Sequence, residues 1–405
     1  MKDRRPVLTR IYALIFIMIA FLLIAYILLT EKRAETVYLS EMRDFSTGWK
    51  APSGQEYTLD DATVKAISDK AGTDNETVIL KKNLPSDLTE DDALCLESMN
   101  ANFKVFIDGV EVYAFASREN LSGASYGRAF HAIGLSPDYS GGKIRLEFDT
   151  VCPDYKLSRL TEMYICPPLS YVRMYARKVA FPCLISFLVF FFGIVLAMVY
   201  IWIPDKTRLP FDIAALGMMA FLMGLWLIVD TRILQLFFGH IYVWRGINRT
   251  VLFLVGYPLI SFFNSLTKLK RTVYHRIVIV GTVLIIGGLI GLRYLTGLDM
   301  LISYPPAIIV FIAGLAIITC IIFTDDYLYC RAHGIETNRK FFYIGVTAFL
   351  GCGIFDFILY ATGIAASGSF GFFTRIGMLV FIAVMLFQFL TWWTTDQESI
   401  ERDRF

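Results

Sequence analysis

The chain has 405 residues, of which 56% are hydrophobic and only 18% are charged, and its formal net charge is +2. A soluble protein of this length carries a larger share of charged residues. The near-neutral balance excludes the strongly basic surface of a nucleic-acid-binding protein. The seven cysteines form no CxxC pair and no Cys/His cluster with the spacing of a zinc site. We therefore expect no bound metal and no cofactor.

The apolar residues gather in long runs. A helix needs about 20 apolar residues to cross the hydrocarbon core of a bilayer. The predicted spans are residues 11–30, 179–203, 211–229, 250–266, 277–296, 305–324, 341–361 and 371–393. The predicted fold is thus a membrane α-helical bundle, made of one N-terminal anchor followed by seven transmembrane helices.

The first span is interpreted as an uncleaved signal anchor, because cationic residues precede it and no small-residue cleavage site follows. Lys and Arg next to the other spans gather on the side of the N-terminus, which the positive-inside rule assigns to the cytoplasm. We predict a multi-pass protein of the plasma membrane with both termini in the cytoplasm. Its segments are a cytoplasmic N-terminus (1–10), the anchor (11–30), an extracellular β-domain (31–177), a seven-helix domain (178–394) and the start of a cytoplasmic signalling helix (395–405).

The extracellular segment has the pattern of a β-sandwich. Residues 103–115 alternate in polarity around Asp108–Gly109, a dipeptide that accepts the positive φ angles of a tight hairpin turn. Further strands are predicted at 77–82, 92–99, 126–133, 143–149 and 162–166. Several short strands with polar turns favour an all-β, jelly-roll-like sandwich.

The order of anchor, β-sandwich and seven helices resembles the bacterial seven-helix receptors with diverse intracellular signalling modules. The most specific local match is the hairpin at 103–115 followed by the segment 127–149, with its Gly-Gly-Lys-Ile-Arg-Leu-Glu-Phe run. The resemblance implies an extracellular jelly-roll similar to carbohydrate-binding modules, and a cytoplasmic output such as a diguanylate cyclase, a histidine kinase or a phosphatase. Only residues 394–405 follow the last span, so either an output module is natively missing or, as we expect, this chain is a piece of a longer receptor.

The resemblance implies that the chain is a sensory receptor, and its residues form no catalytic motif that would predict an enzyme. Its expected partners are the lipid bilayer, an extracellular small molecule or glycan, and a cytoplasmic signalling module, and a homodimer is compatible with this scheme. The long polar loop at 117–126 is the predicted ligand-facing segment, with Arg118, Glu119, Asn120 and Tyr126 as the binding residues. A transporter or channel with an extracellular accessory domain is the alternative function.

Charged residues inside the spans form the second candidate site. Asp356 and Arg375 fall at similar depth near the outer ends of the last two spans, and a buried charge usually faces a partner or a cavity. They are predicted to form an intramembrane polar pair, either lining a polar pocket or making a structural ion pair. Asp230 and Arg293 also lie near outer ends.

The other residues that could take part in chemistry are interpreted as surface, loop or packing residues. The four histidines fall in separate regions and are expected at the surface or in loops, and Asp325, Asp326, His333 and Glu336 are expected in a solvated cytoplasmic loop rather than in an enzyme site. The glycines of the spans at 277–296 and 341–361 are expected at close helix contacts. A disulfide between Cys152 and Cys166 is a further option for the extracellular segment.

Overall fold

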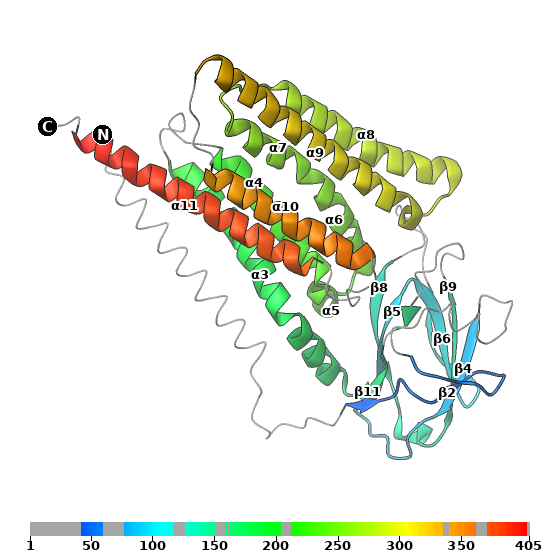
Figure 1. Cartoon of the computed structure of the whole chain (residues 1–405). Helices are drawn as coiled ribbons and strands as arrows, with labels where there is room; N and C mark the ends of the chain where they lie inside the picture. Colours follow the sequence, from blue (N-terminus) through cyan, green and yellow to red (C-terminus); the bar gives the residue numbers. More distant parts are fainter. Residues whose placement is uncertain are drawn as a thin grey trace.

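A computed structural model describes residues 42–59, 77–116, 126–150, 159–160, 162–203, 212–334, 340–361 and 371–402. The predicted anchor at 11–30 lies outside these residues. Figure 1 shows the strands gathered into one domain at one end of a bundle of long helices. We call that end of the bundle the β-domain end and the opposite end the distal end.

The larger sheet is antiparallel and contains the predicted hairpin. Its strands run in the order β3 (Glu56–Tyr57), β2 (Trp49–Lys50), β4 (Val78–Asn83), β9 (Lys143–Thr150), β6 (Ala101–Ile107) and β7 (Val110–Phe115). Asp108 and Gly109 connect β6 to β7 with φ angles of 49° and 89°. The hairpin predicted from this dipeptide is confirmed.

The second sheet is centred on β5 (Ala93–Met99). One edge of β5 pairs with β8 (Arg128–Gly134), and the other edge pairs with β10 (Arg159–Leu160) and β11 (Tyr164–Cys166), which in turn pairs with β1 (Arg43–Asp44). A short 3₁₀ turn, η1 (Pro137–Tyr139), connects β8 to β9. Leu94 and Leu96 of β5 share one core with Phe103 of β6 and Leu146 of β9, so the two sheets pack face to face as a sandwich.

Nine helices follow within the described residues. They are α3 (Pro168–Trp202), α4 (Ile213–Asp230), α5 (Ile233–Phe238), α6 (Ile241–Leu254), α7 (Gly256–Ser265), α8 (Val273–Thr296), α9 (Met300–Ala332), α10 (Lys340–Ala361) and α11 (Phe372–Arg402). By length and composition six helical units of the described chain can cross a membrane, with α6 and α7 counted together. The apolar stretch of α10, Tyr343–Asp356, is shorter. The chain is a multi-pass membrane protein, with six such units against the seven predicted after the β-domain.

Two span boundaries differ from the prediction. α3 begins at Pro168, directly after β11, so the helix already starts within the segment assigned to the β-domain. The span predicted at 250–266 is the second half of a longer unit, Ile241–Ser265, in which α6 and α7 meet at Val255. Arg245 and Arg249 lower the hydropathy of α6. The guanidinium of Arg245 contacts Asn100 of the β-domain, and that of Arg249 lies 5.4 Å from the ring centroid of Tyr304 on α9.

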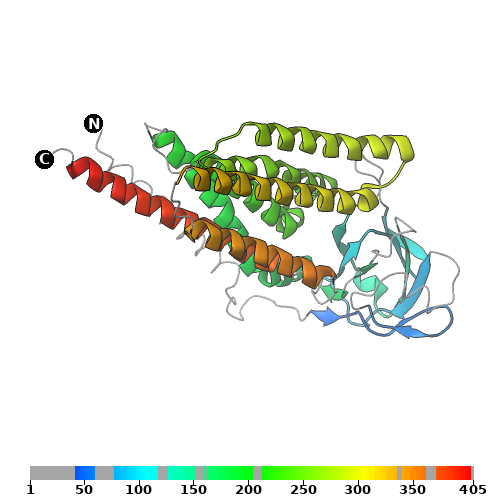
Figure 2. The ribbon, with the colours of Figure 1, turned by 45° about the horizontal axis from the view of Figure 1, so that its top comes forward.

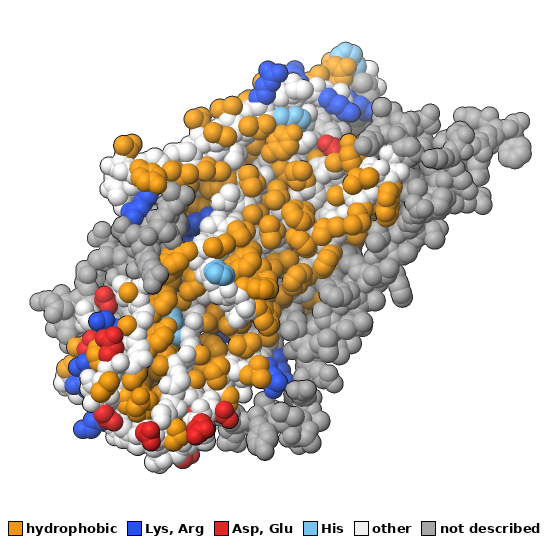
Figure 3. Space-filling view, turned by 180° about the vertical axis from the view of Figure 1, so that it is seen from behind, with side chains coloured by type: hydrophobic (Ala, Val, Ile, Leu, Met, Phe, Trp, Pro, Cys, Tyr) orange, Lys and Arg blue, Asp and Glu red, His pale blue; other side chains and the backbone are white. Residues whose placement is uncertain are grey.

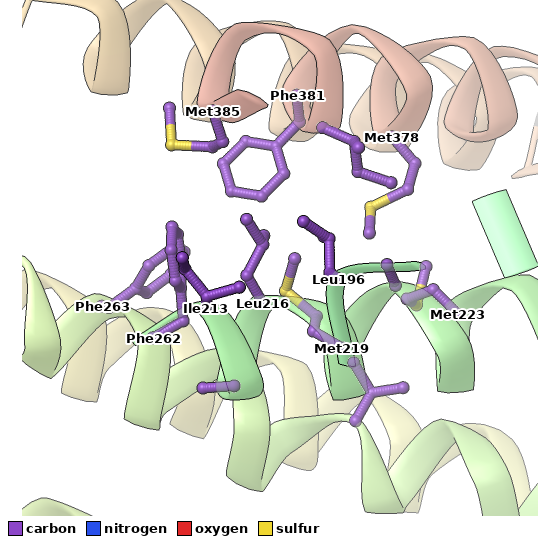
Figure 4. Packing of buried hydrophobic residues seen from close by; sticks show 14 of the residues in the cluster. Leu196, Ile213, Leu216, Met219, Met223, Phe262, Phe263, Met378, Phe381 and Met385 are labelled. Carbon is purple, nitrogen blue, oxygen red and sulfur yellow. The ribbon is translucent and has the colours of Figure 1, made fainter. Parts of the chain in front are cut away.

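The helices divide into a tightly packed group and an outer hairpin. In their most apolar windows, 67% of α4 is buried but only 17% of α8 and 11% of α9. Figure 2 shows α8 and α9 side by side at one edge of the bundle, with α10 and α11 together at another. The packed group has its own core, in which Phe381 and Met385 of α11 meet Leu216 of α4 and Phe262 of α7 (Figure 4).

The glycines that permit close helix contact are not the predicted ones. A Cβ atom added at Gly193 of α3 would lie 2.3 Å from the backbone nitrogen of Phe221, and one at Gly224 of α4 would lie 2.4 Å from the Cα of Phe190. Gly345 of α10 does touch Phe381. Open space surrounds the remaining glycines of the predicted set, namely Gly281, Gly287, Gly288, Gly291, Gly351 and Gly353. That part of the prediction is wrong, because a sequence that is apolar all round does not reveal which helix face points inward.

The surface agrees with a membrane-embedded bundle. Figure 3 shows apolar side chains covering the helices, with acidic and basic side chains together on the β-domain and further Lys and Arg side chains at the distal end. Exposed apolar side chains of this kind include Leu284, Leu295 and Val310, at 68%, 87% and 64% exposure. In water such a band would be an association surface, whereas in lipid it is the expected exterior.

Candidate functional site

The β-domain meets the bundle through one face of β5. Successive side chains of a strand point to opposite faces. Leu94 and Leu96 enter the sandwich core, whereas Cys95 and Glu97 lie on the face toward the helices. Both faces of β5 are therefore buried, and Glu97 is a charged residue with only 7% of its side chain exposed.

Glu97 joins the two parts of the molecule by ion pairs. Its Oε1 lies 3.4 Å from Nη1 of Arg128 on β8 and 3.1 Å from Nη1 of Arg232, in the turn between α4 and α5. A buried carboxylate without cationic partners would be strongly destabilising. The contact between β-domain and bundle is therefore specific, since displacing either surface leaves a buried charge unpaired.

Arg232 is held in an unusual backbone conformation. Its φ of 60° is in the left-handed region, which a non-glycine residue adopts at a cost of about 1–3 kcal/mol. Burial lowers the pKa of Arg232, but the neighbouring charges of Glu97 and Asp230 outweigh it, so the pKa lies above the ordinary value. The turn that carries Arg232 is thus a strained element held in place by charge.

The charges continue from this turn to the last helix. Asp230 ends α4, and its Oδ2 accepts a hydrogen bond of 3.1 Å from Nη2 of Arg375 on α11. Arg375 is 2% exposed and also donates through Nε to the hydroxyl of Ser186 on α3, at 3.1 Å. We call Arg128, Glu97, Arg232, Asp230 and Arg375 the charged network. It runs from β8 and β5 through the α4–α5 turn to α11.

Asp356 binds the same helix end by a different route. Its Oδ2 accepts hydrogen bonds of 2.6 Å from both the backbone N–H and the hydroxyl of Thr374, and its Oδ1 accepts one of 3.3 Å from the backbone N–H of Phe373. These amides belong to the first turn of α11, where a negative charge is stabilising. Asp356 and Arg375 thus both stabilise the start of α11, but with different partners. Asp356 binds backbone amides of the helix, whereas Arg375 pairs with Asp230.

Aromatic packing supports the charged network. Phe130 of β8 stacks edge-on against Tyr175 of α3, with ring centroids 4.6 Å apart. The hydroxyl of Tyr175 donates to the carbonyl oxygen of Thr231 at 3.1 Å, next to Arg232. Ile233 of α5 completes this apolar cluster. The turn is therefore fixed both by charge and by packing against the first part of α3.

A second contact links the β-domain to α6. The rings of Tyr126 and Tyr242 are 6.3 Å apart, and the guanidinium of Arg245 lies 3.5 Å from Oδ1 of Asn100. Arg245 lies over Gly127, where an added Cβ would be 2.5 Å from its Nη1. Gly127 also has a φ of 82°, and this left-handed conformation is what favours glycine at the position.

Of the four predicted ligand-binding residues, the structure describes one, Tyr126. Arg118, Glu119 and Asn120 lie outside the described residues. Tyr126 is 1% exposed, donates a hydrogen bond to the carbonyl of Ala101 and packs on Phe115. The structure thus gives Tyr126 a place in the contact with α6 instead of on an open binding surface.

His131 is also buried, contrary to the expected surface position. It is 4% exposed on β8, where its Nε2 lies 2.8 Å from the hydroxyl of Ser98 and its Nδ1 lies 3.0 Å from that of Tyr113. Burial lowers the pKa of His131 to about 3, so the imidazole is neutral at physiological pH. Ser98 is fully buried, so this Ser–His–Tyr arrangement offers no access to a substrate and acts as a polar tie within the sandwich.

The acidic residues at the distal end are structural rather than solvated. Asp326 of α9 is fully buried and accepts hydrogen bonds of 2.6 Å and 3.2 Å from the backbone N–H groups of Lys268 and Leu269. Asp325 accepts one of 2.7 Å from the hydroxyl of Tyr274. The expectation of a solvated loop is therefore wrong for Asp326, which ties α9 to the α7–α8 connection. Asp325 also lies within α9, but its side chain is 32% exposed and pairs with Arg271 at 3.1 Å. His333 is exposed, and Glu336 lies outside the described residues.

Sequence reasoning missed Glu97 and Arg232, although both leave a signal. Glu97 interrupts an otherwise apolar strand, Ala-Leu-Cys-Leu-Glu-Ser-Met. Arg232 follows Asp230 directly after an 18-residue apolar helix. Neither signal identifies its partner, because the two residues are 135 positions apart in the chain.

The geometry of the described residues includes no group of His, Cys, Asp and Glu that could hold a metal ion. No protein-family model matches the sequence, and a search of curated proteins finds no relative.

Proposed function

We propose that the chain is a transmembrane sensory receptor. A ligand on the outward β-domain, with a carbohydrate as the first candidate class, changes how that domain rests on the helices, and the last helix carries the change to a cytoplasmic output. The observation that carries this proposal is the charged network. One ion pair joins Glu97 of the β-domain to Arg232, a second joins Asp230 to Arg375 of α11, and Arg232 and Asp230 lie two residues apart in the chain. The resemblance to bacterial seven-helix receptors supports the same assignment.

The predicted ligand loop ends at the contact with the bundle. Phe115 precedes the loop and Tyr126 closes it, and their rings are 4.9 Å apart. Tyr126 in turn contacts Tyr242 of α6. A ligand that reshapes this loop therefore acts on residues that already touch the membrane helices.

A ligand shifts a receptor only as far as it binds one state better than the other. In this scheme the two states differ in the contact of Glu97 with Arg232, and the left-handed backbone of Arg232 favours release of the turn once that contact weakens. Release removes charge from beside Asp230, which is the partner of Arg375. The first turn of α11 then loses part of its support.

The proposal is tested by measuring ligand binding and helix response in one sample. The chain in lipid nanodiscs, with Ser399→Cys carrying a fluorine label near the end of α11, is screened against a panel of mono- and oligosaccharides. A binding sugar should raise the melting temperature and also change the fluorine signal. In Glu97→Gln the same sugar should still bind while the fluorine response shrinks, because the loop is intact and the network is broken.

Glu111→Gln is the matched control, since Glu111 pairs with Lys104 on the solvent side of the β6–β7 hairpin. It should keep both binding and response. A sugar that binds the wild type or Glu111→Gln without any change at position 399 would contradict the relay. Uptake of a sugar into proteoliposomes without such a change would favour the transporter alternative.

A further inference from the structure

Two cysteines face each other where the β-domain joins the first membrane helix. β11 pairs with β5 so that Tyr164 lies opposite Cys95 and Cys166 lies opposite Ala93. Cys95 and Cys166 are thus diagonal neighbours on the same face of the sheet. Sγ of Cys95 lies 3.9 Å from the carbonyl oxygen of Cys166, so the Cys95 side chain leans toward its neighbour.

The surroundings of the Cys95 thiol favour its protonated form. The neighbouring Cys166 and burial raise the pKa of Cys95 above its ordinary value. Both residues are fully buried, in a cluster with Tyr171 and Met174 from the first turns of α3. The pair is therefore enclosed between the sheet and the helix.

The position of the pair permits a covalent bond with little rearrangement. Diagonal neighbours in a regular sheet are about 7–8 Å apart, whereas Cα atoms joined by a disulfide are usually about 4.4–6.8 Å apart. Cys166 is the last residue of β11, and Pro167 follows as the cap of α3. Closing the gap therefore displaces the end of a strand and leaves the interior of the sheet unchanged.

We propose that Cys95 and Cys166 form a disulfide in the mature protein, which staples β11 and the start of α3 to β5. This inference rests on the outward placement of the β-domain in the proposed function, because disulfides persist in oxidising compartments. The two thiols lose two protons and two electrons, and the disulfide of a dithiol oxidase of the cell envelope accepts them through a mixed disulfide. Burial of both sulfurs means that the bond forms before α3 covers the pair.

Such a staple would define which part of the contact is fixed. Cys95 and Glu97 lie two residues apart on the same face of β5. A bond at Cys95 holds the sheet to α3, while the ion pair of Glu97 with Arg232 remains free to open. The disulfide then acts as the fixed point about which the β-domain moves.

Peptide mapping of the full chain tests the proposal. Membranes are blocked with an alkylating agent, and the purified protein is digested without reduction. The expected result is a cross-linked peptide pair that joins Cys95 to Cys166 and disappears on reduction. A pair joining Cys152 to Cys166, or alkylated Cys95 and Cys166, would overturn the proposal.

Thermal unfolding supplies the second readout. Reductant present during heating should lower the melting temperature of the wild type by several degrees, because the bond closes a large loop of the unfolded chain. In Cys95→Ser the reductant should have no effect. Cys183→Ser, which replaces a buried thiol of α3, should keep the full sensitivity of the wild type. Equal sensitivity in wild type and Cys95→Ser would contradict the staple.

Labelling of whole cells distinguishes the absence of the disulfide from an error in the proposed outward placement of the β-domain. Val110 is 66% exposed at the tip of the β6–β7 hairpin. Val110→Cys should react with a membrane-impermeant maleimide if the β-domain is outside. Free thiols at Cys95 and Cys166 together with labelling at position 110 would reject the disulfide and keep the topology, whereas an unlabelled position 110 would reject both.

Discussion

The group of α3, α4 and α11 and the hairpin of α8 and α9 are equally apolar, yet they use their residues in opposite ways. The first group places glycines at helix contacts and buries charged residues at the β-domain end. The glycines of the hairpin meet open space, and only 17% of the most apolar window of α8 and 11% of that of α9 is buried. The described contacts between the β-domain and the bundle lie mainly on the first group, so the proposed receptor would couple its β-domain through α3, α4 and α11.

The largest expected effect on folding comes from replacing a glycine at a helix contact, compared with a glycine of the outer hairpin. Gly224→Leu places a side chain into the backbone of Phe190 and should abolish most monodisperse protein in detergent. Gly288→Leu in α8 meets nothing within 4 Å and should leave the yield and the melting temperature unchanged. The amount of monodisperse protein is measured by size-exclusion chromatography of both variants. An equal loss in the two variants would contradict the distinction between the packed helices and the outer hairpin.

The next effect concerns the buried arginine. Arg375→Met leaves Asp230 without its cation at the end of α4, and removal of one partner of a buried ion pair costs about 3–5 kcal/mol. Arg293→Met in α8 removes an arginine whose guanidinium donates to the carbonyl of Gly297 at an exposed helix end, so its cost should stay within about 0.5 kcal/mol. Denaturant unfolding in a fixed detergent compares the two. A small cost for Arg375→Met would show that the pair does not stabilise the bundle.

The comparison of these regions also shows what sequence can and cannot supply. The hairpin around Asp108–Gly109 was predictable because its turn chemistry is local, and the helices were predictable because their length is set by the bilayer. The inward faces were not, since lipid-facing and protein-facing residues are equally apolar. For the candidate site, the sequence indicated Asp356 and Arg375 as charges inside spans, but Asp230 as partner of Arg375 depends on tertiary packing.

Acidic pH should loosen the β-domain while leaving both helical regions intact. The pKa of His131 is lowered to about 3, whereas the unfolded chain binds a proton near pH 6.5. The unfolded state thus binds more protons between these values, so stability falls as the pH drops below about 6.5. The loss should reach about 2–3 kcal/mol at pH 4.5. Between about pH 7 and 4.5 the wild type should lose more stability than His131→Gln, by this amount, in melting experiments. An equal loss in both proteins would contradict the assignment.

The smallest expected effect is local to the outer hairpin. Asp326→Asn keeps an acceptor for the amides of Lys268 and Leu269 but loses its charge, which should cost about 1 kcal/mol. Hydrogen exchange should increase at 268–269 and stay unchanged in the first turn of α11. A change in α11 would show that the two regions are coupled after all.

Hydrogen exchange at the first turn of α11 in nanodiscs tests the central claim most directly. The account predicts that Glu97→Gln increases exchange of the amides at Phe373, Thr374 and Arg375 several-fold, because loss of the carboxylate weakens the turn that carries Arg232 and Asp230. Glu111→Gln should leave these amides unchanged. Equal exchange at α11 in wild type and Glu97→Gln, with both proteins folded, would contradict the claim that the β-domain is coupled to the last helix.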